Sequence, residues 1–285
     1  MRSPRGEVEI RVRLSAFLTF RNRFCYSRLT LGRVRCILGS VAYGFRDADL
    51  KRGFLLQGSE IYEILKRIGV THLHHANSVI TSCTYLEQGG IVSRGFAEDH
   101  RLQQSAQPTD ELDRKYGIWR TIFVPHVDIH DRQGQTKAPN LFGPVLFVLD
   151  LDVLLQLPLG AEVRVTKRSP AYWYDTEPDS ARWFQNAQEV SQNLSPDEIH
   201  KMPAIQIPSG RLDFPNRRAR IILDDPQRHL QSGVNAYTHA EARLREAARH
   251  GKVEVSIERR KCPMGCICAS KYATWSAPVV DFYFG

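Results

Sequence analysis

The chain has 285 residues, of which 42% are hydrophobic and 25% are charged, values that are ordinary for a protein with a buried core. Its longest apolar stretch, residues 144–155, is interrupted by Asp150 and Asp152. It falls short of the ~20 apolar residues that a membrane helix needs. We therefore expect a soluble protein that inserts into no membrane.

The formal net charge of +8 arises entirely in the N-terminal segment. Residues 1–53 hold twelve basic and four acidic residues, whereas the rest of the chain holds 27 of each. We expect residues 1–56 to form a basic, poorly ordered extension. An electrostatic arm for nucleic acid and an Arg-rich targeting segment are the alternatives. Residues 57–285 are then the folded domain.

The extension lacks the pattern of a secretory signal. No apolar region of ~7–15 residues with a small-residue cleavage site follows its basic start. We therefore expect the six cysteines to be reduced thiols rather than a disulfide framework, and we expect the protein to lie in the cytoplasm.

The first strong helical pattern covers residues 59–68. Ser59 can cap this helix and Gly69 can end it. Between them, aliphatic residues recur at the spacing of one helical face: Ile61, Ile64, Leu65 and Ile68.

A β-compatible segment, residues 71–76, follows this helix and carries three histidines, His72, His74 and His75. Asn77 can cap a second helix, which the pair Gly89 and Gly90 would end. Residues 91–93 have the composition of a short strand.

The second half of the domain mixes short strands with helices. A short helix is predicted over residues 110–116, and capping-box patterns at residues 195–198 and 238–241 predict two more, the second of which reaches His250. Strands are predicted over residues 121–129, 144–150, 161–167, 204–207, 219–223 and 253–257. Because strands and helices show no regular alternation, we predict an α+β fold.

Two motifs in this order carry a resemblance: Leu73-His74-His75-Ala76-Asn77 before a helix, and the turn Gly89-Gly90-Ile91-Val92-Ser93-Arg94-Gly95 after it. The strand-like segments 122–125 and 143–148 follow. Over about residues 59–225, the chain resembles the ADP-ribosyltransferase fold, in particular the DNA-modifying DarT-like toxins and, more distantly, the PARP-type enzymes. The resemblance implies a split core of mixed and antiparallel sheets with flanking helices, and NAD as a substrate.

The resemblance also implies roles for single residues. The family histidine that ends the first core strand hydrogen-bonds the nicotinamide ribose, and His75 is the matching position. Cleaving the bond to nicotinamide passes through an oxocarbenium-like species, so the site needs donors for the ribose, a cation for the pyrophosphate and a nearby acid. His75 and Asn77 can serve the ribose, and Arg94 and Arg132 can serve the pyrophosphate.

The sequence offers no clear candidate for the catalytic acid. The family's catalytic glutamate comes immediately before a late strand, and aligning that strand with residues 204–207 places no acidic residue there. Glu198 and Gln206 are the candidates for this role, although a capping box also accounts for Glu198. Asp128 and His130 are expected near the reacting centre.

His126, Asp128 and His130 also offer a different chemistry. On a strand, alternate side chains point the same way, so these three could form half of a metal site, completed by one of the earlier histidines. Metal-dependent hydrolysis of a phosphodiester is therefore the alternative enzymatic function. In the simpler interpretation, Asp128 and Arg132 pair with each other or bind substrate.

The C-terminal segment contains a Cys-x3-Cys-x-Cys pattern, Cys262, Cys266 and Cys268. It is one ligand short of a standard zinc site, and His250 or a distant cysteine would have to complete it. Adjacent basic residues would favour thiolates. Buried thiols are the prediction, and a structural zinc ion is the alternative.

A cluster of aromatic and basic residues follows the predicted strand 161–167. Such rings can stack nucleic-acid bases, although packing is the more common use: Tyr172, Trp173, Tyr174, Trp183 and Phe184, with Lys167, Arg168 and Arg182.

These observations predict an NAD-dependent ADP-ribosyltransferase. The resemblance favours a bacterial toxin or defence effector that modifies nucleic acid or protein, with an antitoxin as a further partner. A metal-dependent nuclease and a catalytically inactive NAD- or nucleic-acid-binding domain of the same fold are the alternatives.

Overall fold

The computed structural model describes residues 54–107, 109–128, 142–262 and 266–285, all of which fall within one compact unit. Nearly all of the predicted N-terminal extension, together with His130 and Arg132, lies outside these residues. Among the described helices, none has the length and apolar character to cross a membrane.

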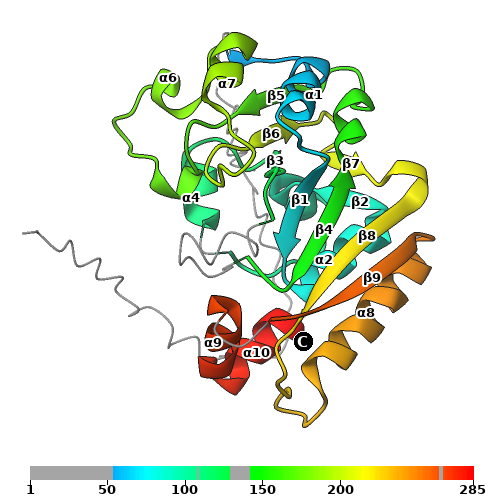
Figure 1. The fold of residues 1–285 in the computed structure, drawn as a ribbon. Helices are drawn as coiled ribbons and strands as arrows, with labels where there is room; N and C mark the ends of the chain where they lie inside the picture. Colours follow the sequence, from blue (N-terminus) through cyan, green and yellow to red (C-terminus); the bar gives the residue numbers. More distant parts are fainter. Residues whose placement is uncertain (1–53, 108, 129–141, 263–265) are drawn as a thin grey trace, which may run out of the picture. The chain divides into compact units, whose positions relative to one another are not determined.

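The larger sheet has four strands in the order β1-β4-β8-β9 (Figure 1). The central pairs are antiparallel, and β9 is parallel to β8. The strands are β1 (His72–Asn77), β4 (Val145–Asp150), β8 (Arg218–Asp225) and β9 (Glu254–Lys261). β4 is buried up to its last residue, as its almost wholly apolar sequence predicts.

A second sheet is antiparallel and has the order β3-β6-β5. It contains β3 (Thr121–Phe123), β6 (Pro203–Gln206) and β5 (Glu162–Val165). A third, two-stranded sheet pairs β2 (Gly90–Val92) with β7 (Arg211–Asp213). Separate mixed and antiparallel sheets with several helices confirm the α+β class.

The backbone joins the two larger sheets next to β1. His74 N donates a 2.7 Å hydrogen bond to the carbonyl of Pro125, two residues beyond β3. This contact brings the histidine-bearing strand against the end of the three-stranded sheet.

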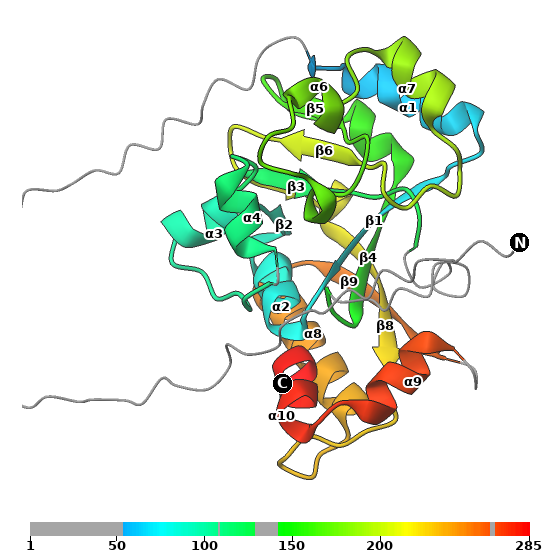
Figure 2. The same ribbon diagram turned by 90° about the vertical axis from the view of Figure 1, so that its left-hand side faces the viewer.

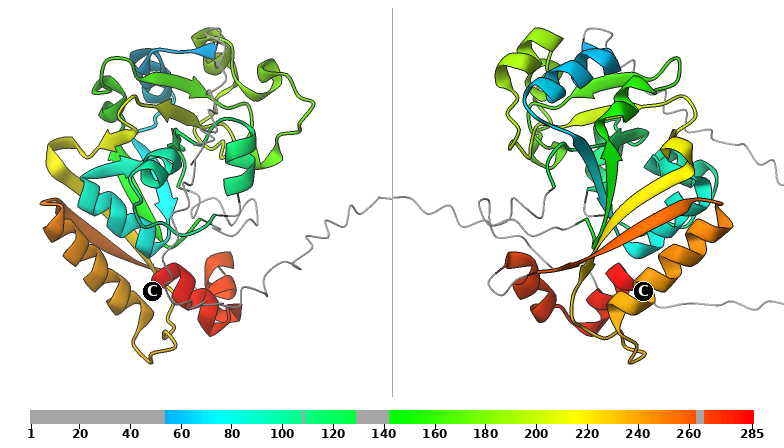
Figure 3. Two further views of the ribbon diagram at one scale, coloured as in Figure 1. Left: turned by 180° about the vertical axis from the view of Figure 1, so that it is seen from behind. Right: turned by 45° about the vertical axis from the view of Figure 1, so that its right-hand side comes forward.

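Helices pack on both sheets. α1 (Gly58–Arg67) and α7 (Ala187–Asn193) contact each other beside the three-stranded sheet (Figure 2). α8 (Ala236–His250) connects β8 to β9 and packs along both strands (Figure 3). α2 (Val79–Gln88) and α10 (Ala277–Phe284) pack against α8.

The remaining elements are short. They are α3 (Arg94–Asp99), α4 (Asp110–Lys115), α6 (Asp179–Arg182), α9 (Ile267–Thr274), η2 (Leu151–Leu155), η3 (Pro170–Tyr172) and η4 (Pro215–Arg217).

Helix starts differ slightly from the predicted ones. α1 begins after Gln57, whose backbone N–H donates to Glu60, rather than at Ser59. α2 is capped by Ser78, whose Oγ accepts from Thr81 N, because Asn77 is still the last residue of β1. The predicted end of α2 is confirmed, since Gly89 has the left-handed φ of 73° that favours glycine.

Three other predictions of local structure are wrong. The strand predicted from residue 121 ends at Phe123, because Pro125 has no N–H for a sheet and gives its carbonyl to β1 instead. Residues 195–198 form a turn rather than a helix start, with Ser195 Oγ bonded to Asp197. Asn235, not Thr238, caps α8.

Candidate active site

His75 lies on the face of β1 that packs against α2, together with Leu73 and Asn77. Its Nδ1 is 2.9 Å from the carbonyl oxygen of Phe123 on β3. Because a carbonyl only accepts, Nδ1 carries the proton and Nε2 is the acceptor. Nε2 faces the Tyr85 hydroxyl at 3.3 Å, which is long for this type of bond.

Electrostatics favour the neutral form of this ring. Burial lowers the pKa of His75, the charge of Arg94 lowers it further, and the Phe123 carbonyl partly opposes both. Burial also raises the pKa of Tyr85 to about 12, so its hydroxyl keeps its proton. At neutral pH the site therefore presents an uncharged imidazole with a fixed tautomer.

Asn77 connects this ring to the segment before α4. Its Nδ2 donates to the Tyr85 hydroxyl at 3.0 Å, and its Oδ1 accepts from Gln107 Nε2 at 2.9 Å. Gln107 N donates in turn to Asp110. The Oε1 atom of Gln107 is buried with no hydrogen-bond partner among the described residues.

Arg94 belongs to the same network, but its donors are already engaged. Nε and one terminal nitrogen bind Asp110 Oδ1 at 3.0 and 2.5 Å, and the other terminal nitrogen binds Gln104 at 2.7 Å. The structure thus brings the predicted residues His75, Asn77 and Arg94 together. Arg94 would have to exchange an ion pair to bind a phosphate.

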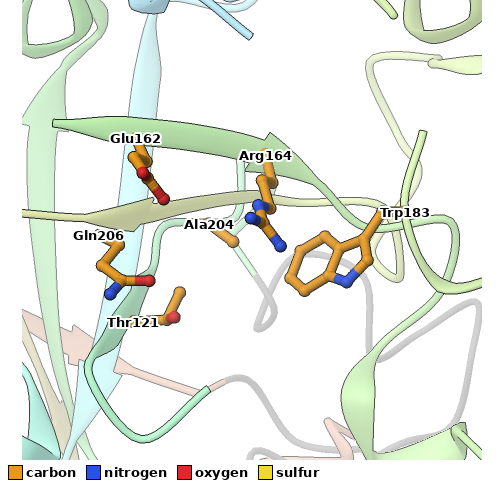
Figure 4. Close-up of a pocket in the computed structure, with 6 residues that line it drawn as sticks. All are labelled: Thr121, Glu162, Arg164, Trp183, Ala204 and Gln206. Carbon is orange, nitrogen blue, oxygen red and sulfur yellow. The ribbon is translucent and has the colours of Figure 1, made fainter. Parts of the chain in front are cut away.

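A second group of polar residues lines a hollow on the three-stranded sheet (Figure 4). Gln206 lies on the central strand β6, paired in register with Glu162 of β5 and with Thr121 of β3. Arg164 and Ala204 form the next row, and Trp183 closes one side. Its cavity volume is only about 10 Å³, room for about one water molecule and far below the ~300–1,000 Å³ of ordinary ligand pockets, so the hollow is a shallow polar depression.

Arg164 is the unusual member of this hollow. It is 4% exposed, and its Nη2 has no hydrogen-bond partner in the described part of the chain. Burial lowers its pKa, while the charges of Glu162 and Asp179 raise it in opposition. A buried guanidinium without full pairing is costly, so this position is suited to an anionic group.

Sequence reasoning missed Glu162 and Arg164. The alternation of β5 predicted that both lie on its polar face, but only strand pairing shows that Glu162 lies opposite Gln206. Glu198 lies elsewhere, in the turn before β6. Its Oε1 accepts from His200 N, and its Oε2 is 3.6 Å from Lys201.

Asp128 and His126 have separate partners. Arg260 Nη1 donates to the Asp128 carboxylate at 2.5 Å, and the Nε2 of His126 is 2.9 Å from the carbonyl of Ser195. Since the strand ends at Phe123, alternation gives no reason for these two side chains to share a face. His130, the third residue of the proposed metal set, and Arg132 lie outside the described residues.

The structure brings the three C-terminal cysteines close together. The sulfur atoms of Cys262, Cys266 and Cys268 lie within 4.8 Å of one another, and in the described ranges they are the single group of three or more His, Cys, Asp or Glu side chains that could hold a metal ion.

The aromatic cluster divides into two parts. Trp173, Trp183 and Phe184 are buried, and the two indole rings meet edge to face at 5.0 Å, so packing accounts for them. Tyr172 and Tyr174 are exposed, and the guanidinium of Arg168 lies 5.1 Å from the Tyr174 ring centre.

Neither of the comparisons with known proteins assigns the chain to a family: no family model matches the sequence, and no curated protein matches it.

Proposed function

We propose that the chain is an NAD-dependent ADP-ribosyltransferase. The proposal rests on the resemblance carried by residues 73–77 and 89–95 and on one observation, the hydrogen bond between His75 Nδ1 and the Phe123 carbonyl. This bond attaches the ribose-binding histidine to β3. The neighbouring strand of β3 is β6, which carries Gln206 opposite Glu162.

The chemistry follows from the state of each group. The neutral His75 accepts a hydrogen bond from a ribose hydroxyl at Nε2, replacing the long contact to Tyr85. The bond from Nδ1 to the Phe123 carbonyl holds the ring in place, and Asn77 keeps the Tyr85 hydroxyl beside it. Fixed geometry of this kind lowers the entropy cost of reaching the transition state.

Glu162 takes the role of the missing acid. Its carboxylate would stabilise the positive charge that develops on the ribose as the bond to nicotinamide breaks, and the amide of Gln206 beside it would orient a ribose hydroxyl. The leaving nicotinamide takes the bonding electron pair, and the acceptor nucleophile then bonds to the ribose carbon and loses its proton.

Arg164 is a better candidate for the pyrophosphate than Arg94. The donors of Arg94 are held by Asp110 and Gln104, whereas Arg164 is buried beside the proposed acid with one terminal nitrogen unsatisfied. Arg94 instead braces the segment that reaches Asn77. The acceptor is a nucleic acid or a protein, and the exposed Tyr172 and Tyr174 give a surface that could stack against it.

The test is a nicotinamide-release assay. The full chain is incubated with NAD and either single-stranded oligonucleotides or cell lysate, with and without EDTA, and the transfer of labelled ADP-ribose is followed. We expect release and transfer that survive EDTA and are lost in His75→Ala. Absence of release with any acceptor would overturn the proposal. EDTA-sensitive cleavage of nucleic acid would point to the nuclease, and NAD binding without release to an inactive domain.

A further inference from the structure

The three C-terminal cysteines converge from two elements. Cys262 follows the last residue of β9, Cys266 is the N-cap of α9, and Cys268 is the second residue of that helix. Cys262 and Cys268 are 7% and 2% exposed, and Cys266 is half-buried. Their sulfur atoms all lie within 4.8 Å of one another.

We propose that Cys262, Cys266 and Cys268 bind one zinc ion. Tetrahedral zinc with bonds of about 2.3 Å separates its sulfur ligands by about 3.8 Å. The observed separations of up to 4.8 Å therefore require a contraction of about 1 Å or less. An iron–sulfur cluster attaches its cysteines to different irons, which needs a wider spacing than a single ion does.

Two of the three thiols lie at a helix N-terminus. Arg259 and Arg260 come before Cys262 but are paired with Asp225 and Asp224, and the hydrogen bond with Cys268 together with burial raises the pKa of the Cys262 thiol. Cys266 and Cys268 lie in the first turn of α9, where backbone N–H groups and the helix dipole stabilise negative charge. The three cysteines leave the fourth position of a tetrahedral ion open on the side where Cys266 is half-exposed, one protein ligand fewer than a closed structural zinc site has.

The position of the cluster gives the metal a structural role. Arg260, two residues before Cys262, binds Asp224 Oδ1 at 2.6 Å and Asp128 at 2.5 Å. Tyr272 of α9 donates to Asp224 Oδ2 at 2.6 Å. A metal that joins the end of β9 to the start of α9 would hold both Arg260 and Tyr272 on the same buried carboxylate, and so fix the C-terminal helices to the larger sheet.

The experiment measures metal directly. The full chain is purified without chelators, and its zinc content is determined by mass spectrometry. Zinc is then exchanged for Co²⁺, whose sulfur-to-metal charge-transfer absorption increases with the number of thiolate ligands. We expect one zinc ion per chain and a Co²⁺ spectrum of a tetrahedral site with three thiolates.

Cys266→Ser is the test variant, because this cysteine is the most exposed of the three. We expect it to lose the metal, whereas Cys83→Ser, a change of the buried cysteine on α2, should keep it. Wild-type chain that holds no zinc and gives no Co²⁺ thiolate absorption, or whose cysteines are recovered as a disulfide, would overturn the proposal. The zinc content and the Co²⁺ absorption of the wild-type chain can be measured whether or not the Cys266→Ser variant folds, and they do not depend on transferase activity.

Discussion

The Asp128 carboxylate accepts a 2.5 Å hydrogen bond from Arg260 Nη1, although 132 positions separate the two residues in the chain. Arg260 also binds Asp224, which is fully buried. One guanidinium thus pairs with two carboxylates, one from the segment after β3 and one from β8. The arrangement fixes the end of the three-stranded sheet to the edge strand β9.

Removing this guanidinium should cost much stability. Arg260→Met leaves two buried carboxylates without their cation, and breaking a buried pair in this way costs about 3–5 kcal/mol. Arg218→Met is the matched control, because its pair with Glu254 is about 70% exposed on both sides and should be worth about 1 kcal/mol or less. Urea unfolding measures both. Equal losses would show that Arg260 does not act through buried charge.

His75→Ala should reduce nicotinamide release by about 10²-fold or more, since misplacing a positioned reactant has costs of this order. His72→Ala is the control on the same strand, because His72 lies on the opposite face of β1 and contacts Thr71 at 2.8 Å. We expect it to retain activity. If both variants were equally active, His75 would have no part in the reaction.

The pH profile of the same reaction reports the state of His75. Burial lowers the pKa of its imidazole below the ordinary 6.5. The fall of kcat/KM that protonation of His75 causes should therefore be centred below pH 6.5. A fall centred at pH 6.5 or above that persists when other titratable groups are varied would contradict a lowered pKa of His75.

Glu162→Gln should lower kcat by about 10²–10³-fold with little change in NAD affinity, because the carboxylate acts on charge that develops only in the transition state. Glu258→Gln on β9 is an exposed acid changed in the same way, and it should be neutral. Single-turnover kinetics and NAD titration separate the two effects. A loss of affinity alone would make Glu162 a binding residue.

Asp113 should make stability depend on pH. Burial raises the pKa of its carboxyl from 3.8 to about 7, with a further increase from Asp110. Between pH 4 and 7 the native state therefore holds a proton that the unfolded state has lost, and stability falls as pH rises, by up to ~1.4 kcal/mol per pH unit. Asp113→Asn should remove this decline in urea unfolding series.

Asp175→Asn is the control for that series. Lys115 lowers the pKa of the Asp175 carboxyl below its ordinary 3.8, so its contribution is constant between pH 4 and 7. A stability difference between wild type and Asp113→Asn that does not change over this range would show that Asp113 titrates normally.

The sequence allowed most local structure to be predicted. Helical periodicity located α1, and the nearly apolar run of β4 predicted a central strand, because these patterns report burial directly. Boundaries were less accurate where two residues competed for one role. Ser78 caps α2 because Asn77 is needed by β1, and Asn235 precedes the expected cap of α8.

The candidate site was predictable only where it is local. His75, Asn77 and Arg94 lie within 20 positions of one another, and the structure joins them in one hydrogen-bond network. Glu162 became a candidate only through its pairing with Gln206, which no spacing in the sequence encodes. Asp128 was assigned to chemistry because its partner Arg260 is so distant in the chain.

That distance also bears on how the chain is made. A ribosome synthesises Asp128 132 residues before Arg260 and Asp224 36 residues before it, so until β9 is made the nascent chain has carboxylates destined for burial and no cation to accompany them. Burying either alone costs several kcal/mol. We therefore expect the last folding step to follow the emergence of β9, and a chain that stops short of Arg260 to be degraded rather than to accumulate.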